Sequence, residues 1–542
     1  MTADRERSVA EQRLLAEQVA RLTAGRITRR QFVLSALAAG IVLPTALGVA
    51  ERAHAQTPVK GGALRIGLGS GSTTDSLDPA TYEGTVNTVL AYTYANNLVE
   101  VDHSGALVPE LAESFESADA ITWVFKLRQG VEFHDGKSLV PEDVIASINH
   151  HRGEGSKSAV GGIVKQIADI RADGDSVVFE LDAPNADFPY VLSDYHLLIL
   201  PSKDGAIDPT AGIGTGGYVI DVFEPGVRVK ATRHANYFKG DRAHFDEVEL
   251  VSIIDATARQ NAVMSGDVDA IDRVDPKIVA LLARVPSLEI LEIESPLHYT
   301  FPMRLDTPPF DNADLRMAIK LAVNRQELVD KILLGHGALG NDTPIAPSYP
   351  YFAEDLPQRE FDPEQAAALY KKSGHSGALQ LSAADTAFAG AVDAAQLIAA
   401  SAGAAGIDVE VVREPNDGYW SNVWNKKPWC ASYWSGRPTV DWMFASGYVA
   451  DTEWNETAWR DTADAKRFNE LVLEGRAELD EQKRATLYAE AQRLLRDDGG
   501  SLMPMFANHI MAVSKQIAHD GNVAANWELD GAKAPERWWR AG

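Results

Sequence analysis

The chain has 542 residues, enough for about three domains of ~150–200 residues each, and its 45% hydrophobic and 24% charged content is ordinary for a folded globular protein. The formal net charge of −26 disfavours nucleic acid and anionic membrane surfaces as partners. The single cysteine, Cys430, excludes an intrachain disulfide and a cysteine cluster that holds zinc or iron–sulfur.

The first 55 residues have the pattern of a bacterial export signal. Arg29 and Arg30 precede an apolar run over residues 32–50, and Ala53-His54-Ala55 forms a small-x-small cleavage pattern. Paired arginines, an apolar core and such a cleavage site are typical of a twin-arginine signal peptide. We therefore expect export to the periplasm, cleavage near Ala55 and a mature chain that is soluble.

An uncleaved membrane anchor is the alternative interpretation of the same apolar run. Its length approaches the ~20 residues of a minimal membrane span. Gly40, Pro44 and Gly48 interrupt the run, however, and the cleavage pattern follows it at once. These features favour the signal peptide.

The rest of the chain alternates between short strands and helices. In chain order, apolar periodicity and capping residues predict a strand over 61–69, a helix over 84–98, a strand over 123–127, a helix over 141–148, a strand over 176–181 and a hairpin over 218–220 and 227–231. Further on they predict a helix over 255–265, a strand over 288–293, helices over 313–334, 363–373 and 388–405, a strand over 407–412 and mostly helix over 462–497. The glycines of residues 67–71 have the wrong spacing for a nucleotide-binding loop, so we expect a turn at the end of the first strand. The pattern is mixed α/β without an internal repeat.

A set of short motifs resembles one protein family. They are SLDP at 76–79, LVPELAESFE at 107–116, WVFKLRQGVEFHDGK at 123–137, PEDV at 141–144, GTGGY at 214–218, NYFKG at 236–240, PFDNADLRMA at 309–318, DEQKR at 480–484 and YAEAQ at 488–492. In this order they are similar to the extracellular solute-binding proteins of family 5, the peptide- and nickel-type binding components of ABC importers. The likeness extends over nearly all of residues 60–515.

The resemblance implies an α/β fold with two hinged lobes, the type 2 periplasmic-binding-protein fold, with an extra domain on the first lobe. It assigns residues 56–88, 213–298 and 513–542 to lobe I, 89–212 to the extra subdomain and 299–512 to lobe II. The crossing strands are expected at 297–301 and 504–507. Lobes joined by two strands can close on each other and bury a small ligand at their interface.

Side chains that often carry catalysis have simpler interpretations here. The resemblance makes residues 134–136 (HDG) a surface turn with Gly136 at a positive φ, and His150-His151 lacks the third ligand that a metal needs. No Gly-x-Ser-x-Gly nucleophile with a plausible triad is present, and Cys430 is expected to be a packed thiol. We therefore predict no enzymatic activity, no cofactor and no metal site.

Aromatic residues gather in residues 419–459, which hold seven of the eleven tryptophans. One interpretation is that they fill the core of lobe II. The other is that some of them line a cleft, where an indole offers a flat apolar wall and an N–H donor. We expect both, with two or three tryptophans at the ligand.

Within that stretch, one position departs from the family pattern. In peptide-binding members that this chain resembles, an aspartate three residues after the residue matching Trp434 pairs with the α-amino group of the peptide. Here that position is Arg437, whose guanidinium favours a carboxylate or phosphate. Asp441 either supplies the missing acid or pairs with Arg437. The resemblance brings a loop after the first strand to the opposite wall, so the predicted ligand-binding residues are Tyr82, Glu83, Trp420, Trp434, Arg437, Thr439 and Asp441.

These observations predict a periplasmic, monomeric solute-binding protein that captures a peptide or peptide-like solute and delivers it to an ABC permease at the inner membrane. The alternative within the binding class is an anionic opine-like conjugate of a sugar and an amino acid, which suits Arg437 and the aromatic walls. Nickel and haem are disfavoured because no histidine or methionine cluster appears. The alternative from another class is a secreted hydrolase, which needs a nucleophile and a base in the cleft.

The export prediction can be tested by replacing Arg29 and Arg30 with lysine. Lysine keeps the charge but lacks the planar guanidinium fork, so the precursor is expected to stay in the cytoplasm. Cell fractionation and immunoblotting of the double variant measure this. Periplasmic accumulation equal to that of the unchanged chain would contradict the twin-arginine assignment.

Overall fold

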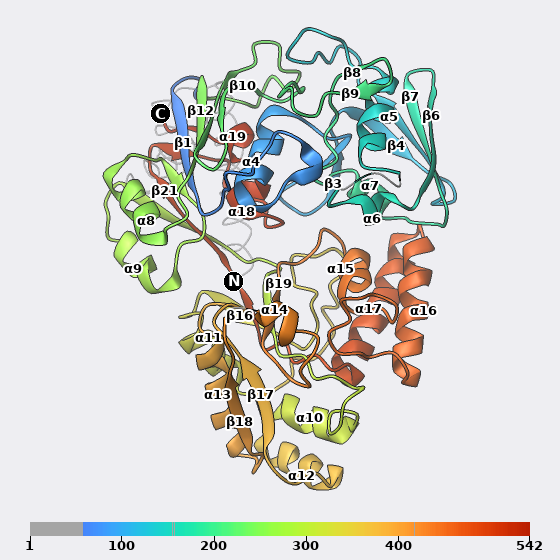
Figure 1. Ribbon diagram of the computed structural model, residues 1–542, viewed down its shortest axis with the longest axis vertical. Helices are drawn as coiled ribbons and strands as arrows, with labels where there is room; N and C mark the ends of the chain where they lie inside the picture. Colours follow the sequence, from blue (N-terminus) through green and yellow to red (C-terminus); the bar gives the residue numbers. More distant parts are fainter. Residues whose placement is uncertain (1–57, 154–155, 157, 417) are drawn as a thin grey trace, which may run out of the picture.

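The computed structural model describes residues 58–542, except for residues 154, 155, 157 and 417. The predicted export signal lies outside these described residues. The two lobes lie one above the other in Figure 1, each around its own sheet, and an extra subdomain extends from the side of lobe I. We use lobe I, extra subdomain and lobe II for these three bodies; the residue boundaries given above remain predictions.

Lobe I is built on a seven-stranded sheet with the strand order β10-β11-β12-β1-β13-β21-β14. Its strands are β1 (Ala63–Leu68), β10 (Tyr218–Glu224), β11 (Arg228–Arg233), β12 (Glu247–Ser252), β13 (Ala270–Ile271), β14 (Leu288–Ile293) and β21 (His509–Ser514). Its α-helices are α4 (Gly84–Tyr94), α8 (Ala256–Ser265), α9 (Val279–Leu282), α18 (Glu528–Gly531) and α19 (Ala534–Arg537). Two 3-10 helices, η1 (Pro79–Thr81) and η2 (Pro276–Ile278), and the small strand pair β22 (Ile517–Ala518) and β23 (Trp539–Arg540) complete the lobe. Strand β1 lies in the middle, parallel to β12 and β13, and its buried Leu64, Ile66 and Leu68 anchor the core. Central parallel strands are buried on both faces, which explains their apolar sequences.

The extra subdomain holds a separate four-stranded antiparallel sheet, β4-β5-β7-β6. Its elements are β2 (Val99–Val101), β3 (Leu107–Pro109), β4 (Ala112–Glu116), β5 (Thr122–Leu127), α5 (Pro141–His150), α6 (Gly161–Val164), β6 (Ile167–Asp173), β7 (Ser176–Leu181), α7 (Phe188–Val191), β8 (Ser202–Lys203) and β9 (Ala206–Ile207). Trp123, Phe125 and Leu127 alternate inward along β5 and form its core with α5. The subdomain therefore has its own apolar core.

Lobe II carries the four-stranded sheet β16-β20-β15-β19 and the parallel pair β17-β18. Its elements are β15 (His298–Thr300), α10 (Ala313–Leu321), α11 (Arg325–Lys331), β16 (Gly337–Leu339), α12 (Pro363–Ser373), β17 (Leu379–Ala383), α13 (Ala391–Gly403), β18 (Val409–Arg413), α14 (Tyr419–Asn422), β19 (Ser432–Trp434), α15 (Val440–Gly447), α16 (Ala463–Ala477), α17 (Glu481–Asp498) and β20 (Met505–Ala507). Cys430 is a buried free cysteine, and its backbone forms an isolated β-bridge with Ser382 of β17. The predicted packed thiol is therefore confirmed.

Two predicted helices prove to be pairs of helices. The segment 313–334 breaks into α10 and α11, because Asn324 is extended and its side chain accepts a hydrogen bond from the Glu327 amide to start a new helix. The segment 462–497 breaks into α16 and α17, where Asp480 caps in the same way through the Lys483 amide. Local capping competes with the continuous apolar stripe that predicts one long helix. The other predicted elements match observed ones within a few residues at each end, and Gly136 has the predicted positive φ of 83°.

The lobes are joined where β14 leads into β15 and where β20 leads into β21, close to the predicted crossing strands. These two connections run side by side: the Ala507 amide donates to the Leu297 carbonyl at 2.8 Å, and Ser295 Oγ donates to the Ala507 carbonyl at 2.7 Å. The two passages thus form one narrow two-stranded link, the geometry that permits hinge motion.

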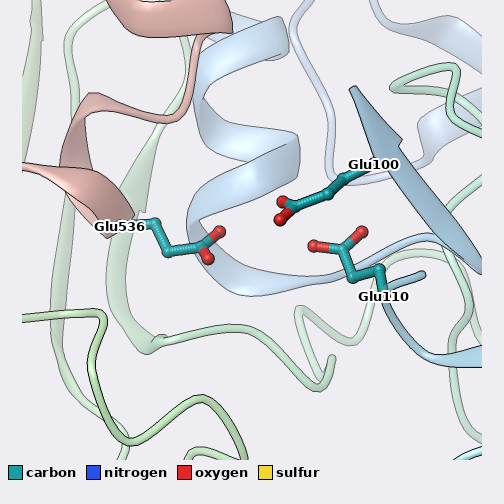
Figure 2. Close-up of side chains that lie close together, drawn as sticks. All are labelled: Glu100, Glu110 and Glu536. Atoms are coloured by element: carbon teal, nitrogen blue, oxygen red, sulfur yellow. The ribbon is translucent and has the colours of Figure 1, made fainter. Parts of the chain in front are cut away.

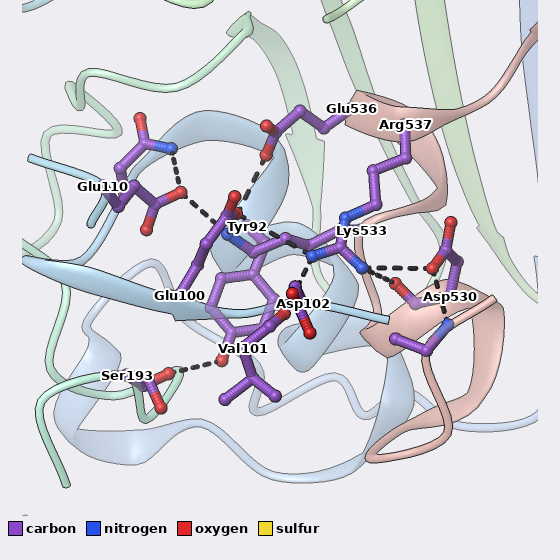
Figure 3. Close-up of polar contacts among 12 residues, drawn as sticks. Tyr92, Glu100, Val101, Asp102, Glu110, Ser193, Asp530, Lys533, Glu536 and Arg537 are labelled. Atoms are coloured by element: carbon purple, nitrogen blue, oxygen red, sulfur yellow. Dashed lines mark hydrogen bonds and ion pairs between the residues drawn. The ribbon is translucent and has the colours of Figure 1, made fainter. Parts of the chain in front are cut away.

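A buried cluster of charges ties the C-terminal tail to lobe I and the extra subdomain. Glu100, Glu110 and Glu536 converge in Figure 2, and the ammonium groups of Lys239 and Lys533 lie among them, as the contacts of Figure 3 show for Lys533. The Lys533 Nζ lies 2.6 Å from Glu100 and 2.7 Å from Glu110, and the Lys239 Nζ lies 2.7 Å from Glu110 and 3.0 Å from Glu536.

The lysines give this cluster a structural role. Burial alone raises the pKa of Glu100, but the charges of Lys533 and Lys239 outweigh it and hold the pKa well below its usual range. The Glu100 carboxylate is therefore ionised, and the two ammonium groups fill the place among the three glutamates that a cation would take.

Replacing Lys533 with methionine is expected to destabilise lobe I. Removing one partner of a buried ion cluster leaves uncompensated charge, which typically costs ~3–5 kcal/mol. Denaturant unfolding of the Lys533→Met variant measures the loss, with Lys371→Met, an exposed position on α12, as the matched control. Equal stability of the two variants would show that the cluster does not secure the tail.

Candidate ligand-binding site

A cavity of about 830 Å³ lies between the lobes. The segment 185–196 of the extra subdomain lines one wall, and the segment 436–446 of lobe II lines the opposite wall. Figure 1 shows α6 and α7 facing α15 and α17 across this interface. Direct contacts close its edge: the Ala186 amide donates to the Arg476 carbonyl at 2.7 Å, and Arg484 lies 2.6 Å from Asp187. The cavity has the size and interlobe position of a small-molecule site.

Arg437 reaches the cavity from the turn between β19 and α15. Its amide donates to the Tyr349 hydroxyl at 2.7 Å, its Nη1 donates to the Gly436 carbonyl, and its guanidinium lies 5.4 Å from the centre of the Trp434 ring. Gly436 has a φ of 83°, and a Cβ there would lie 2.6 Å from Pro296, so glycine is required for the turn. The turn thus holds Arg437 against the hinge.

The charge of Arg437 has no ionic partner in the part of the chain that the structure describes. No carboxylate of the described residues lies within 4.0 Å of its guanidinium. Burial lowers the pKa of Arg437, and the nearby Asp194 opposes that shift from across the cavity. A partly desolvated guanidinium without a carboxylate is prepared to bind an anion.

Asp441 lines the cavity, but it pairs with Arg476 and not with Arg437, so one of the two roles expected from the sequence is wrong and the other, as the missing acid, stays a prediction. Both of its carboxylate oxygens lie 3.0 Å from Arg476 Nε on α16. Burial raises the pKa of Asp441 to about 6, and Arg476 limits the rise. Thr439 also lines the cavity, but its hydroxyl caps α15 by accepting from the Trp442 amide. Asp441 therefore belongs to a structural ion pair in the cavity wall.

Aromatic rings from both lobes line the cavity, and sequence reasoning missed most of them. They are Tyr195, Trp442, Trp454 and Trp527. Trp442 and Trp454 fall in the tryptophan-rich stretch and were not singled out there, whereas Trp527 comes from the C-terminal tail, where no local signal exists. Other tryptophans of the stretch fill the core, as Trp429 and Trp459 do with no exposed surface. Tryptophans of the stretch therefore both line the cavity and fill the core, and the number that contact the ligand stays a prediction.

Four of the predicted site residues do not line the cavity. Tyr82 is buried in the core of lobe I, where its hydroxyl contacts the Leu77 carbonyl and Tyr94. Glu83 is exposed at the start of α4, and Trp420 is 39% exposed and packs edge-on against Trp424 and Tyr433. Trp434 lies behind Arg437 and supports it. The extra subdomain contributes Asp194 and Tyr195, and the tail of lobe I contributes Trp527, in place of residues 82 and 83.

Comparison with known proteins identifies the family. The model of the bacterial extracellular solute-binding proteins, family 5, matches residues 106–456, more than half of the chain. The chain belongs to this family. The predicted resemblance is therefore confirmed, and so is the prediction that this solute-binding protein is not an enzyme.

This solute-binding protein is similar to a glutathione-binding protein and to solved structures at identities between 20% and 26%. The glutathione-binding protein GsiB of Escherichia coli O157:H7 is 26% identical over 336 residues, which cover 61% of this chain and 65% of that protein, less than two thirds of its length. Among solved structures, AgaA of A. tumefaciens R10 in complex with agropinic acid is 24% identical with a TM-score of 0.71, covering 89% of this chain and 99% of that one. The Helicobacter pylori protein DppA in complex with the peptide STSA is 20% identical with a TM-score of 0.70 and the same coverages. These likenesses confirm the predicted fold. None of the described helices is long and apolar enough to cross a bilayer.

Behind the cavity, a buried carboxyl group holds two tryptophans in place. Glu456 is 1% exposed, and its oxygens accept hydrogen bonds from the indole N–H groups of Trp424 at 2.6 Å and Trp434 at 3.1 Å. No lysine or arginine of the described chain lies within 4.0 Å of this carboxyl. Burial therefore raises the pKa of Glu456 to about 7, and the indole donors limit the rise.

The raised pKa of Glu456 predicts a pH-dependent stability. Between its ordinary pKa of 4.5 and about 7, the folded state binds more protons than the unfolded state, so this group's contribution to the free energy of unfolding falls as pH rises. The difference in free energy of unfolding between Glu456→Gln and the unchanged protein is expected to shift in favour of the variant by about 2–3 kcal/mol between pH 5 and pH 8. Urea unfolding at several pH values measures it. A difference that is constant with pH would show that Glu456 does not titrate in this range.

Proposed function

We propose that this protein captures a small solute carrying an acidic group, of peptide-like size, between its lobes and presents it to an ABC permease at the inner membrane. One observation carries the proposal: Arg437 brings to the wall of the interlobe cavity a guanidinium that has no ionic partner among residues 58–542 as described. In the mature protein this would take place in the periplasm after export.

The ligand's acid would complete the hydrogen bonding of Arg437. Among the described residues, Nη1 bonds to the Gly436 carbonyl and Nε to Ser446 Oγ at 3.3 Å, while Nη2 has no partner. A carboxylate approaching Nη2 would form a charge-assisted bond with a half-buried guanidinium. Such a bond is strongest when the lobes close, so it favours the closed form.

The solutes of the relatives agree with this chemistry. Their names and titles mention glutathione, a tetrapeptide and agropinic acid, and each of these compounds carries at least one carboxyl group. The first two support the peptide-like solute as the leading candidate.

An opine-like conjugate of a sugar and an amino acid is the second candidate. The observation that favours it is the pairing of Asp441 with Arg476, which leaves segment 434–441 without a free acid for a peptide's α-amino group. A hydrolase is not favoured, because both ring nitrogens of His196 in the cavity wall are occupied, by Asp194 and by the Tyr82 carbonyl, and no hydroxyl bonds to that ring among the described residues.

The proposal predicts that Arg437→Ala weakens binding of an acidic solute. Loss of a desolvated charge-assisted pair costs ~2–5 kcal/mol, which corresponds to a tens- to thousands-fold rise in Kd. Glutathione, the peptide Ser-Thr-Ser-Ala and agropinic acid serve as probes in calorimetry, and Arg413→Ala, an exposed position on lobe II, is the matched control.

Two outcomes would contradict the proposal. Binding of a probe with equal affinity by the Arg437→Ala variant would remove the anion anchor. Failure of all three probes, together with native mass spectrometry that finds a retained solute without an acidic group, would remove the acidic class. Unfolding curves of the variant separate either result from loss of the fold.

A further inference from the structure

The wall of the cavity opposite Arg437 holds a carboxylate in a fixed orientation. Asp194, which follows α7, has a side chain that is 10% exposed. Its Oδ1 accepts from the His196 amide at 2.9 Å and lies 2.6 Å from His196 Nδ1. No hydrogen bond among the described residues uses its Oδ2. One oxygen is therefore bound to protein, the other has no hydrogen-bond partner among the described residues, and the residue itself lines the cavity.

His196 is itself held on its far side. Its Nε2 lies 3.0 Å from the Tyr82 carbonyl, which can only accept, and its ring packs on Tyr195 at 4.1 Å between centroids. The imidazole therefore cannot turn to release Oδ1 without losing both contacts. This arrangement fixes the direction of the free oxygen.

Asp194 differs from the other two aspartates of the cavity. Asp187 is paired with Arg484 and Asp441 with Arg476, whereas no arginine or lysine of the described chain lies within 4.0 Å of Asp194. Among the described residues, the one ionisable side chain within that distance of its carboxylate is the His196 imidazole. Asp194 therefore remains able to accept a hydrogen bond from a cation.

The two available charges come from different lobes. Asp194 belongs to the extra subdomain and Arg437 to lobe II, and the Asp194 charge acts on the pKa of Arg437. Tyr195, next to Asp194, packs edge-on against Trp527, so aromatic surface adjoins the carboxylate. The cavity thus presents a carboxylate on one side and a guanidinium on the other.

We propose that the solute is a zwitterion, with its acid on Arg437 and an ammonium group on the Oδ2 of Asp194. This inference rests on the proposed function and narrows its substrate class to amino acids, peptides and conjugates that keep a free amine. It also gives each lobe one charged contact, so that the ligand bridges them. A ligand with both charges therefore stabilises the closed form more than a ligand with a single charge does.

Acetylation of the probe's amine tests the inference. Glutathione and Ser-Thr-Ser-Ala are each titrated as the free-amine compound and as the N-acetyl compound, using the unchanged protein, Asp194→Asn and the control Asp173→Asn at an exposed position of the same subdomain. In the unchanged protein and the control, acetylation is expected to raise Kd at least tenfold for a compound that binds. In Asp194→Asn, the free amine is expected to lose at least tenfold in affinity, and acetylation should then have little further effect.

Three results would overturn the inference: N-acetyl compounds that bind the unchanged protein as tightly as the free amines, an Asp194→Asn variant that keeps full affinity for the free amines, or no binding of either free-amine probe. The Arg437→Ala variant separates this failure from failure of the proposed function. If N-acetyl compounds bind and Arg437→Ala abolishes their binding, the acidic class stands and the amine contact falls. If C-terminal amides of the probes bind as tightly as the acids, the anion anchor itself falls.

Discussion

The architecture depends on one constraint, the pair of adjacent chain passages between the lobes. Ser295 and Leu297 of the first passage bond to Ala507 of the second, so the link acts as a single narrow strap. Gly436 packs against Pro296 of the same strap, which places Arg437 next to the axis about which the lobes would turn. A group near a hinge axis moves little when the lobes close. A hinge motion about this strap would therefore displace Arg437 less than the parts of lobe II that lie farther from it.

Electrostatics in the cavity separate structural charges from available ones. Opposite charges neutralise each other within two ion pairs, Asp441–Arg476 and Asp187–Arg484. The Asp187–Arg484 pair also joins the extra subdomain to lobe II directly. Arg437 forms no such ion pair with any described residue. Its guanidinium packs against the Trp434 ring, and the Trp434 indole N–H donates to Glu456. An uncompensated guanidinium costs stability in the empty protein. The unpaired guanidinium makes the site selective for acidic solutes, because neutral and cationic solutes would leave it unpaired.

The sequence predicted the lobes better than the site. Ordered motifs and apolar periodicity are local signals, and they located the family, the first strand and the crossing strands. The position of Arg437 was found because it departs from a local pattern. Asp194, Tyr195 and Trp527 come from segments far apart in the chain and meet only through the packing of three bodies, so no local pattern marks them. Tyr82 was misplaced because its loop does lie near the cavity, but its side chain turns into the core of lobe I and only its carbonyl acts on the site, through His196.

The position of β21 in the lobe I sheet has a consequence for how the chain assembles. The described strands and helices of lobe II follow one another from β15 to β20, whereas lobe I needs β21 between β13 and β14 and the tail residues Lys533 and Glu536 in its charge cluster. During synthesis the ribosome therefore releases every residue of lobe II before the last inner strand of lobe I exists. Domains commonly complete in the order of synthesis, from the N-terminus onward. Here the lobe whose sequence begins first is the one that must be finished last.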